Sequence, residues 1–136
     1  METKFESKTG KITSSEQRIY SFVSDFNNFK QFIPEDKVKD FQSTENNCRF
    51  TISGMGEVGL KILEKEPYHT VKITGEGMAN QQFVFWIQLK EVSTNDTRIK
   101  LTIKSDLNPM LKMMASKPLQ NFLDKLVEAM ERMNFD

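Results

Sequence analysis

The sequence predicts an α+β fold in which a curved antiparallel sheet of about seven strands wraps around a long C-terminal helix. Two observations carry this prediction. Apolar and polar residues alternate over most of residues 38–104, as in strands with one buried and one wet face. Over residues 119–130 the apolar residues instead recur every three or four positions, which is the spacing of one helix face.

The first 34 residues are predicted to form one strand and then two short helices. Residues 2–12 alternate weakly and are interpreted as the strand. Ser14 is the predicted N-cap of the first helix, because Gln17 stands three positions later and completes a capping box. The second helix covers about two turns over residues 27–33, and Pro34 ends it because proline disfavours helical geometry in the residue before it.

Six further strands are predicted between the short helices and the terminal helix. Their connections are short and rich in Asn, Asp, Gly or Pro, which favours antiparallel hairpins over crossovers. A sheet with one apolar face needs a cover, and the terminal helix has a matching apolar stripe. The predicted strands lie within residues 38–43, 49–53, 58–62, 71–74, 83–89 and 98–104.

The C-terminal region is predicted to be helical from Asn108, a favourable N-cap that is followed by Pro109 at the first helical position. Pro118 would remove a hydrogen bond from a helix interior. We therefore predict a break there, with a short turn or helix over residues 109–115 and a longer helix that restarts at residue 116 or 117.

Composition and charge exclude several classes of protein. The 136 residues fit one domain, predicted to span residues 1–136. The 19 basic and 19 acidic residues cancel, so we expect no nucleic-acid partner. The single cysteine, Cys48, suits a reducing compartment. The charged start of the chain does not resemble a secretory signal, and the longest apolar run, residues 83–87, is too short to cross a bilayer. We therefore expect a cytoplasmic protein without stable membrane insertion.

This order of elements resembles the helix-grip fold of the START-related superfamily, also called SRPBCC. That group includes lipid-transfer domains, polyketide cyclase-like proteins and the major birch-pollen allergens. The resemblance covers nearly the whole chain. It is carried by the paired short helices that end at Pro34, the Gly54-Met55-Gly56 hairpin, the strands at 83–89 and 98–107, and the proline-interrupted terminal helix. It implies a cavity between the sheet and the long helix that often holds an apolar or amphipathic small molecule.

We expect a small hydrophobic or amphipathic ligand to be bound by the inward faces of the sheet and the terminal helix. Each residue would supply apolar contact and no bond-making chemistry. The predicted wall consists of Phe50, Ile52, Leu60, Ile62, Phe83, Phe85, Ile87, Leu101 and Ile103. The predicted lid consists of Met110, Met114, Leu119, Leu123 and Leu126. Methionine side chains adapt to variable ligands, but core filling is the favoured interpretation of Met110, Met113 and Met114.

A second set of aromatic residues also has two interpretations. The set either anchors the short helices to the sheet or forms a gate over one end of the cavity. Its members are Phe22, Phe26, Phe29 and Phe32.

The sequence contains no recognisable catalytic constellation, metal site or cofactor motif. His69 is the only histidine, and we interpret it as an exposed turn residue. Gly54, Gly56 and Gly59 match the bare spacing of a dinucleotide loop, but a strand follows them where that motif needs a helix. The alternative is an enzyme of the polyketide cyclase type. Its candidate polar groups are Ser7, Thr9, Tyr20, Tyr68 and His69.

Trp86 does not fit the inward apolar pattern. If Phe83, Phe85 and Ile87 point into the core, Val84 and Trp86 point outward, and Trp86 lies near Thr102 or Lys104. One interpretation is a ring covered by lysine stems with some cation–π attraction. The other interpretation is a contact patch for another protein. It allows a homodimer through the Val84/Trp86 face. It also allows the remaining alternative for the function, a compact protein-interaction module without a ligand.

Overall fold

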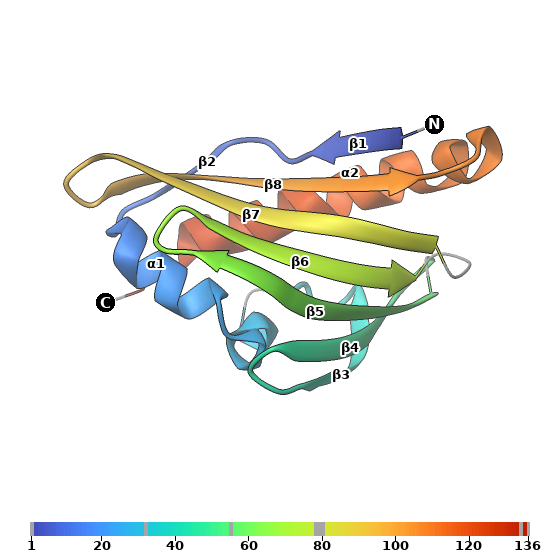
Figure 1. Cartoon of the computed structure of the whole chain (residues 1–136), viewed down its shortest axis with the longest axis horizontal. Coiled ribbons are helices and arrows are strands. Elements are labelled where there is room, and N and C mark those ends of the chain that lie inside the picture. Colours follow the sequence, from blue (N-terminus) through green and yellow to red (C-terminus); the bar gives the residue numbers. More distant parts are fainter. Residues whose placement is uncertain (1, 32, 55, 78–80, 134, 136) are drawn as a thin grey trace.

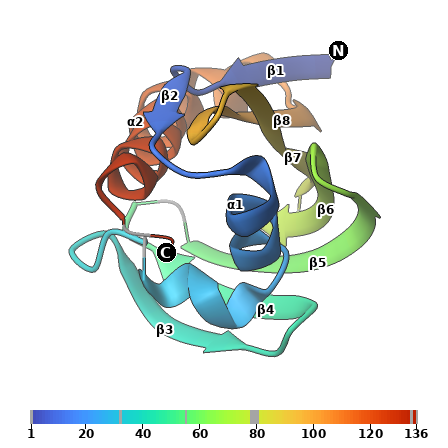
Figure 2. The same ribbon diagram turned by 90° about the vertical axis from the view of Figure 1, so that its left-hand side faces the viewer.

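The computed structural model describes residues 2–31, 33–54, 56–77, 81–133 and 135, and it has the predicted α+β architecture. A single antiparallel sheet curves around the C-terminal helix α2 without closing into a barrel (Figures 1 and 2). The elements in chain order are β1 (Glu2–Glu6), β2 (Gly10–Ile12), α1 (Glu16–Val23), the 3₁₀ helix η1 (Phe26–Gln31), β3 (Val38–Ser43), β4 (Asn47–Ile52), β5 (Gly56–Glu66), β6 (Thr70–Gly77), β7 (Gln81–Ser93), β8 (Asp96–Asp106) and α2 (Pro109–Arg132).

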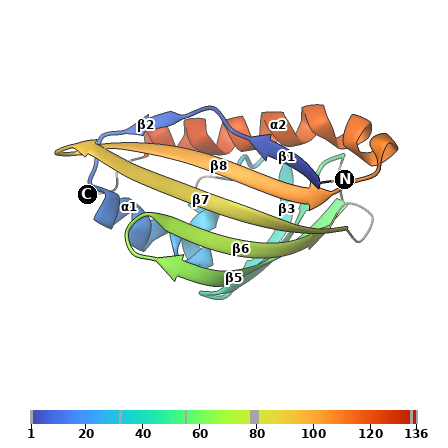
Figure 3. The ribbon, with the colours of Figure 1, turned by 45° about the horizontal axis from the view of Figure 1, so that its top comes forward.

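The strands follow one another across the sheet in the order β1-β8-β7-β6-β5-β4-β3, and β2 also pairs with β8. Every pairing from β3 to β8 joins consecutive strands, so the predicted hairpins and antiparallel sheet are confirmed. The N-terminal strands β1 and β2 both pair with β8, so the first residues of the chain lie beside β8 and next to α2 (Figure 3).

The predicted single strand over residues 2–12 is wrong, because the chain leaves the sheet between β1 and β2. The Ser7 amide still donates to the Leu101 carbonyl at 2.8 Å, but the Leu101 amide donates to the Ser7 hydroxyl, at 2.9 Å. That hydroxyl in turn donates to the carbonyl of Lys8. A side chain therefore replaces one backbone acceptor of the ladder, and the strand pairing resumes only at Gly10.

The helix-start prediction is one residue early. The N-cap of α1 is Ser15, whose hydroxyl accepts a hydrogen bond from the Arg18 amide, while Ser14 is buried beside it. The second predicted helix is present as η1, with 3₁₀ geometry.

The break predicted at Pro118 is also wrong, because α2 continues from Pro109 to Arg132. The predicted N-cap is confirmed, since the Asn108 side chain accepts the Leu111 amide at 2.9 Å. Pro118 cannot donate to the carbonyl of Met114, but both residues are exposed, so water can satisfy that carbonyl. The helix therefore tolerates Pro118 because this residue lies on its solvent-exposed side. Among the described helices, none is long and apolar enough to cross a membrane.

The apolar stripe of α2 packs on the inner face of the sheet as predicted. Its buried residues are Leu119, Leu123, Leu126, Val127 and Met130. Gly10 of β2 sets the distance, because a Cβ atom at this position would lie 2.4 Å from Cγ1 of Val127. The absence of a side chain at residue 10 thus allows β2 and α2 to make close contact.

We expect Gly10→Ala to lower the free energy of unfolding by about 1–3 kcal/mol, because the added methyl forces the strand and the helix apart. Urea unfolding followed by circular dichroism measures the change. Thr9→Ala, at an exposed neighbouring position, is the control and should leave stability within about 0.5 kcal/mol of the wild type. Equal stability of the two variants would contradict the assigned role of Gly10.

Candidate ligand-binding cavity

An apolar cavity lies between α2, η1 and the inner face of the sheet. Its volume is about 40 Å³, far below the roughly 300–1,000 Å³ of typical small-molecule pockets. The side chains around it are Phe29, Ile33, Phe50, Ile52, Val58, Leu60, Phe83, Phe85, Ile103, Leu119, Phe122, Leu123 and Leu126. All of these side chains are hydrocarbon, so the cavity favours apolar groups and contributes no group for bond chemistry.

Nine of the fourteen predicted ligand-binding residues surround this cavity. They are Phe50, Ile52, Leu60, Phe83, Phe85, Ile103, Leu119, Leu123 and Leu126. Ile87 and Leu101 are buried on the same face of the sheet but do not line the cavity, and Ile62 is only partly buried.

The two predicted lid methionines lie elsewhere. Met110 and Met114 are 70% and 68% exposed, and Met113 between them is 80% exposed. The buried residues of α2 begin only at Leu119, because the first turns of the helix extend past the ends of β1 and β8 (Figure 3). Neither proposed role, core filling or ligand contact in the cavity, therefore applies to these three side chains.

Four residues around the cavity are absent from the predicted set: Phe29, Ile33, Val58 and Phe122. Val58 shares its strand face with Leu60, so alternation alone would have found it. Phe29 and Ile33 come from η1 and the turn after it, and only tertiary packing brings them to the sheet. Phe29 lines the cavity. Phe26 is fully buried and packs against Phe29, with the two ring centroids 4.6 Å apart. The aromatic set therefore includes both an anchor and a residue that lines the cavity. Phe32 lies outside the described residues.

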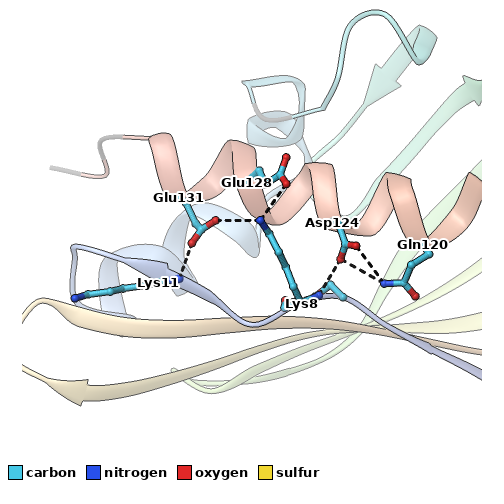
Figure 4. Close-up of polar contacts among 7 residues, drawn as sticks. Lys8, Lys11, Gln120, Asp124, Glu128 and Glu131 are labelled. Atoms are coloured by element: carbon cyan, nitrogen blue, oxygen red, sulfur yellow. Dashed lines mark hydrogen bonds and ion pairs between the residues drawn. The ribbon is translucent and has the colours of Figure 1, made fainter.

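One long edge of α2 is fastened to β2 and to the segment between β1 and β2 (Figure 4). The Lys8 amide donates to Asp124 Oδ1 at 2.8 Å, and the Lys8 ammonium contacts Glu128 Oε1 at 3.0 Å. Farther along, the Lys11 amide donates to Glu131 Oε2 at 3.0 Å. We call these five residues the clasp. A neighbouring hydrogen bond, from the Gln120 side chain to the Glu6 carbonyl at 2.7 Å, extends the same seam.

A solvent groove of about 480 Å³ separates another edge of α2 from η1 and the turn after it. Lys30, Gln31 and residues 33–36 line one side of this groove. Lys125, Glu128, Ala129 and Arg132 line the other side, so Glu128 of the clasp also borders the groove. No hydrogen bond or ion pair recorded for the described residues joins α2 to this side. The helix is therefore held by polar contacts along one edge and by apolar packing alone along the edge that borders the cavity.

None of the five polar candidates for cyclase chemistry lines the cavity. The Ser7 hydroxyl is committed to backbone groups, and Thr9 is exposed. Tyr20 stacks edge-on against Tyr68 with ring centroids 5.5 Å apart, and burial, with a smaller effect of Tyr68, raises the pKa of the Tyr20 hydroxyl. His69 is exposed, with Nδ1 3.5 Å from Glu16 Oε2.

No Cys, His, Asp or Glu side chain of the described residues lines the cavity. Burial raises the pKa of the Cys48 thiol to about 12, which keeps it protonated and unreactive. Among the residues that the structure describes, no cluster of His, Cys, Asp or Glu is arranged to hold a metal ion. Strand β5 begins at Gly56, where a dinucleotide-binding loop would need a helix, as the sequence predicts.

Trp86 points away from the cavity, on the outer face of the sheet. It pairs with Thr102 of β8 and Lys72 of β6, so the predicted neighbour is confirmed. The Lys72 and Lys104 ammonium groups lie 6.0 and 5.6 Å from the ring centroid. The ring is thus partly covered by lysine side chains, at the floor of a shallow trough of about 1000 Å³ that crosses this face.

Comparison with known proteins supports the fold and assigns the family. Residues 9–133 match the CoxG family model, which describes a component of carbon monoxide dehydrogenase. The chain belongs to the CoxG family. This CoxG-family chain therefore has an SRPBCC-type fold, in agreement with the helix-grip architecture seen here.

Solved structures share the fold of this CoxG-family chain at low sequence identity. Truncated norcoclaurine synthase from Thalictrum flavum superposes with a TM-score of 0.71 at 12% identity, over 98% of this chain and 96% of that one. A START superfamily protein from Mycobacterium smegmatis gives 0.63 at 16% identity, over 96% and 94% of the two chains. A conserved protein from Geobacillus kaustophilus gives 0.70 at 10% identity, over 97% and 93%. No curated protein sequence matches the chain.

The clasp makes a prediction about alkaline pH. Glu128 raises the pKa of Lys8 above its ordinary 10.5, so charged Lys8 stabilises the fold fully below that pH. The contribution is lost as the pH rises through the folded-state value. We expect Lys8→Met to be less stable than wild type at neutral pH, with the difference shrinking as the pH rises beyond 10.5.

Urea unfolding of both proteins at several pH values measures this difference. Lys112→Met, which removes an exposed lysine at the other end of α2, is the matched control. A difference between wild type and Lys8→Met that stays constant through the alkaline range would contradict the assigned role of Lys8.

Proposed function

We propose that this protein binds a small hydrophobic or amphipathic molecule between the sheet and α2. The observation that carries the proposal is a wholly apolar cavity on a side of α2 where the described residues make no recorded hydrogen bond or ion pair to the sheet or η1. The SRPBCC fold supports a ligand-binding scaffold in general terms. Cys48 is free and buried, which favours action in a reducing compartment such as the cytoplasm.

The small volume of the cavity sets a condition on this function. About 40 Å³ accommodates only a few heavy atoms, so a larger ligand has to displace side chains. The clasp opposes movement of the edge of α2 that faces β1 and β2. We therefore propose that the cavity widens by movement of the opposite edge, where Leu119 and Phe122 meet Phe29 and Ile33.

A second candidate function is catalysis of the polyketide cyclase type. It is favoured by the likeness to norcoclaurine synthase, one structure of which was solved with dopamine and hydroxybenzaldehyde. That ligand set belongs to the plant enzyme, which is 14% identical to this chain. The apolar lining of the cavity favours binding over catalysis.

The size of the cavity provides a direct test of binding. The probe is 11-(dansylamino)undecanoic acid, whose fluorescence rises in apolar surroundings. Leu119→Ala enlarges the cavity, and we expect it to tighten probe binding several-fold while lowering stability by about 2–5 kcal/mol. Leu101→Ala removes an equally buried leucine that does not line the cavity.

The matched pair separates binding from general loosening of the core. We expect Leu101→Ala to lose comparable stability while its probe affinity stays at the wild-type value. Equal effects of the two substitutions on probe affinity, or no detectable probe binding by any of the three proteins, would refute binding in this cavity.

The direction of opening is tested by covalent bridges. Glu35→Cys with Ala129→Cys, joined by a short bismaleimide, ties down the edge beside the groove, and we expect probe binding to be lost. Lys8→Cys with Glu128→Cys, joined in the same way, replaces the clasp and should leave binding unchanged. Buried Cys48, with its raised pKa, is not expected to react.

Each bridged protein is compared with its own unbridged form by titration with the same probe. If the groove bridge leaves binding intact while the clasp bridge abolishes it, the hinge lies on the other side of α2 and the proposal of movement at Leu119 and Phe122 is wrong.

A further inference from the structure

The outer face of the sheet, which α2 does not cover, carries its charges in rows that run across the strands. Directly paired residues in neighbouring strands point to the same face, so the pairing defines these rows. One row is anionic over β1, β8 and β6, with Glu2, Asp106 and Glu76, and reaches on β4 the residue Arg49, which is paired with Glu57 at 2.8 Å. The next row, two residues along each strand, is cationic, with Lys4, Lys104 and Lys61.

Most members of these two rows line the trough on the outer face. Val84 and Trp86 contribute apolar surface to the same trough. Both residues are half-buried on a central strand, at positions where a solvated sheet face normally carries polar residues. Val84 stands within the cationic row, between Lys104 and Thr74, and Trp86 lies two residues farther along β7, on the side away from the anionic row.

We propose that this face binds a second copy of the chain in a two-fold symmetric dimer. The symmetry axis runs across the strands, between the anionic and the cationic row. Lys104 of each copy then faces Asp106 of the other, and Lys4 faces Glu2. A two-fold interface repeats each such contact, so these four charges on one copy each meet an opposite charge on the other.

The charge pattern argues for a second copy as the partner. A strongly anionic partner such as a nucleic acid would meet the anionic row, and a strongly cationic partner would meet the cationic row. The two rows balance each other, and the formal net charge of the whole chain is zero, so two copies do not repel at long range.

The same pattern selects the orientation of the dimer. An axis parallel to the strands would place each row over the same row of the other copy, with Asp106 over acidic residues and Lys104 over basic ones. Juxtaposed like charges are costly at an interface. An axis across the strands exchanges the rows and pairs opposite charges.

The expected dimer is weak. Exposed ion pairs each contribute at most about 1 kcal/mol and are screened by salt. We therefore expect dissociation in the micromolar range or above at low salt, with weaker association as salt is added. The ion pairs would set the geometry of the contact more than its affinity.

Charge reversal tests the proposal. Association is measured by sedimentation velocity between about 5 and about 500 μM at low salt, a range suited to micromolar affinity. Emission from Trp86, the single tryptophan, reports on the face itself. Lys104→Glu alone and Asp106→Lys alone each place like charges opposite one another, and we expect at least about tenfold weaker association for either variant.

Two combinations then distinguish a specific contact from general damage. An equimolar mixture of the two single variants should associate again, because each presents the charge that the other lacks. The double variant Lys104→Glu/Asp106→Lys should also regain self-association. Circular dichroism checks that every variant is folded.

Lys90→Glu is the matched control. Lys90 is exposed on the same face, six residues along β7 from Val84 and thus about 20 Å away, so its reversal should leave association unchanged. A wild-type chain that stays monomeric throughout the concentration range would overturn the proposal. So would single variants that associate like wild type, or a mixture that behaves like its unmixed components.

Discussion

Burial of the apolar stripe of α2 against the inner face of the sheet is the interaction on which the rest of this structure depends. Neither surface is stable in water without the other, because a one-sided sheet and an amphipathic helix both need an apolar partner. Leu123, Val127 and Met130 are fully buried in this contact. At Gly10 the missing side chain lets β2 approach α2 closely, so helix and sheet pack without a gap on this side.

The contact is asymmetric, and the asymmetry places the candidate site. Along β1 and β2, charged and backbone groups of the clasp hold the helix in one position. Along η1, packing is apolar, a cavity remains, and a groove admits water to the edge of the helix. Polar contacts are directional and resist sliding, whereas apolar contacts can be exchanged for those of a ligand at low cost. The less constrained edge is therefore where we propose that a ligand enters.

The two faces of the sheet differ in chemistry. The inner face is lined by hydrocarbon side chains and is covered by the chain itself. The outer face carries an anionic and a cationic row, with Val84 in the cationic row and Trp86 two residues beyond it. Pleating keeps these sets apart, because successive residues of a strand point in opposite directions. Strand β7 thus contributes Phe85 to the cavity and Trp86 to the outer trough without conflict.

Local patterns in the sequence were sufficient to predict the antiparallel sheet, the buried stripe of α2 and nine of the cavity residues. Period-two and period-3.6 spacing depend only on neighbouring residues, and the burial of an apolar face follows directly from them. The sequence also identified Asn108 as a helix cap and placed Trp86 near Thr102 or Lys104, and Thr102 is its partner in the structure.

Tertiary structure alone decided where α2 leaves the sheet, and so exposed Met110 and Met114. It also brought Phe29 and Ile33 to the cavity, let Ser7 interrupt the first strand, and left Pro118 on the wet side of a continuous helix. Each outcome depends on how far one element extends relative to another. That distance is set by packing between residues remote in the chain, which no local periodicity records.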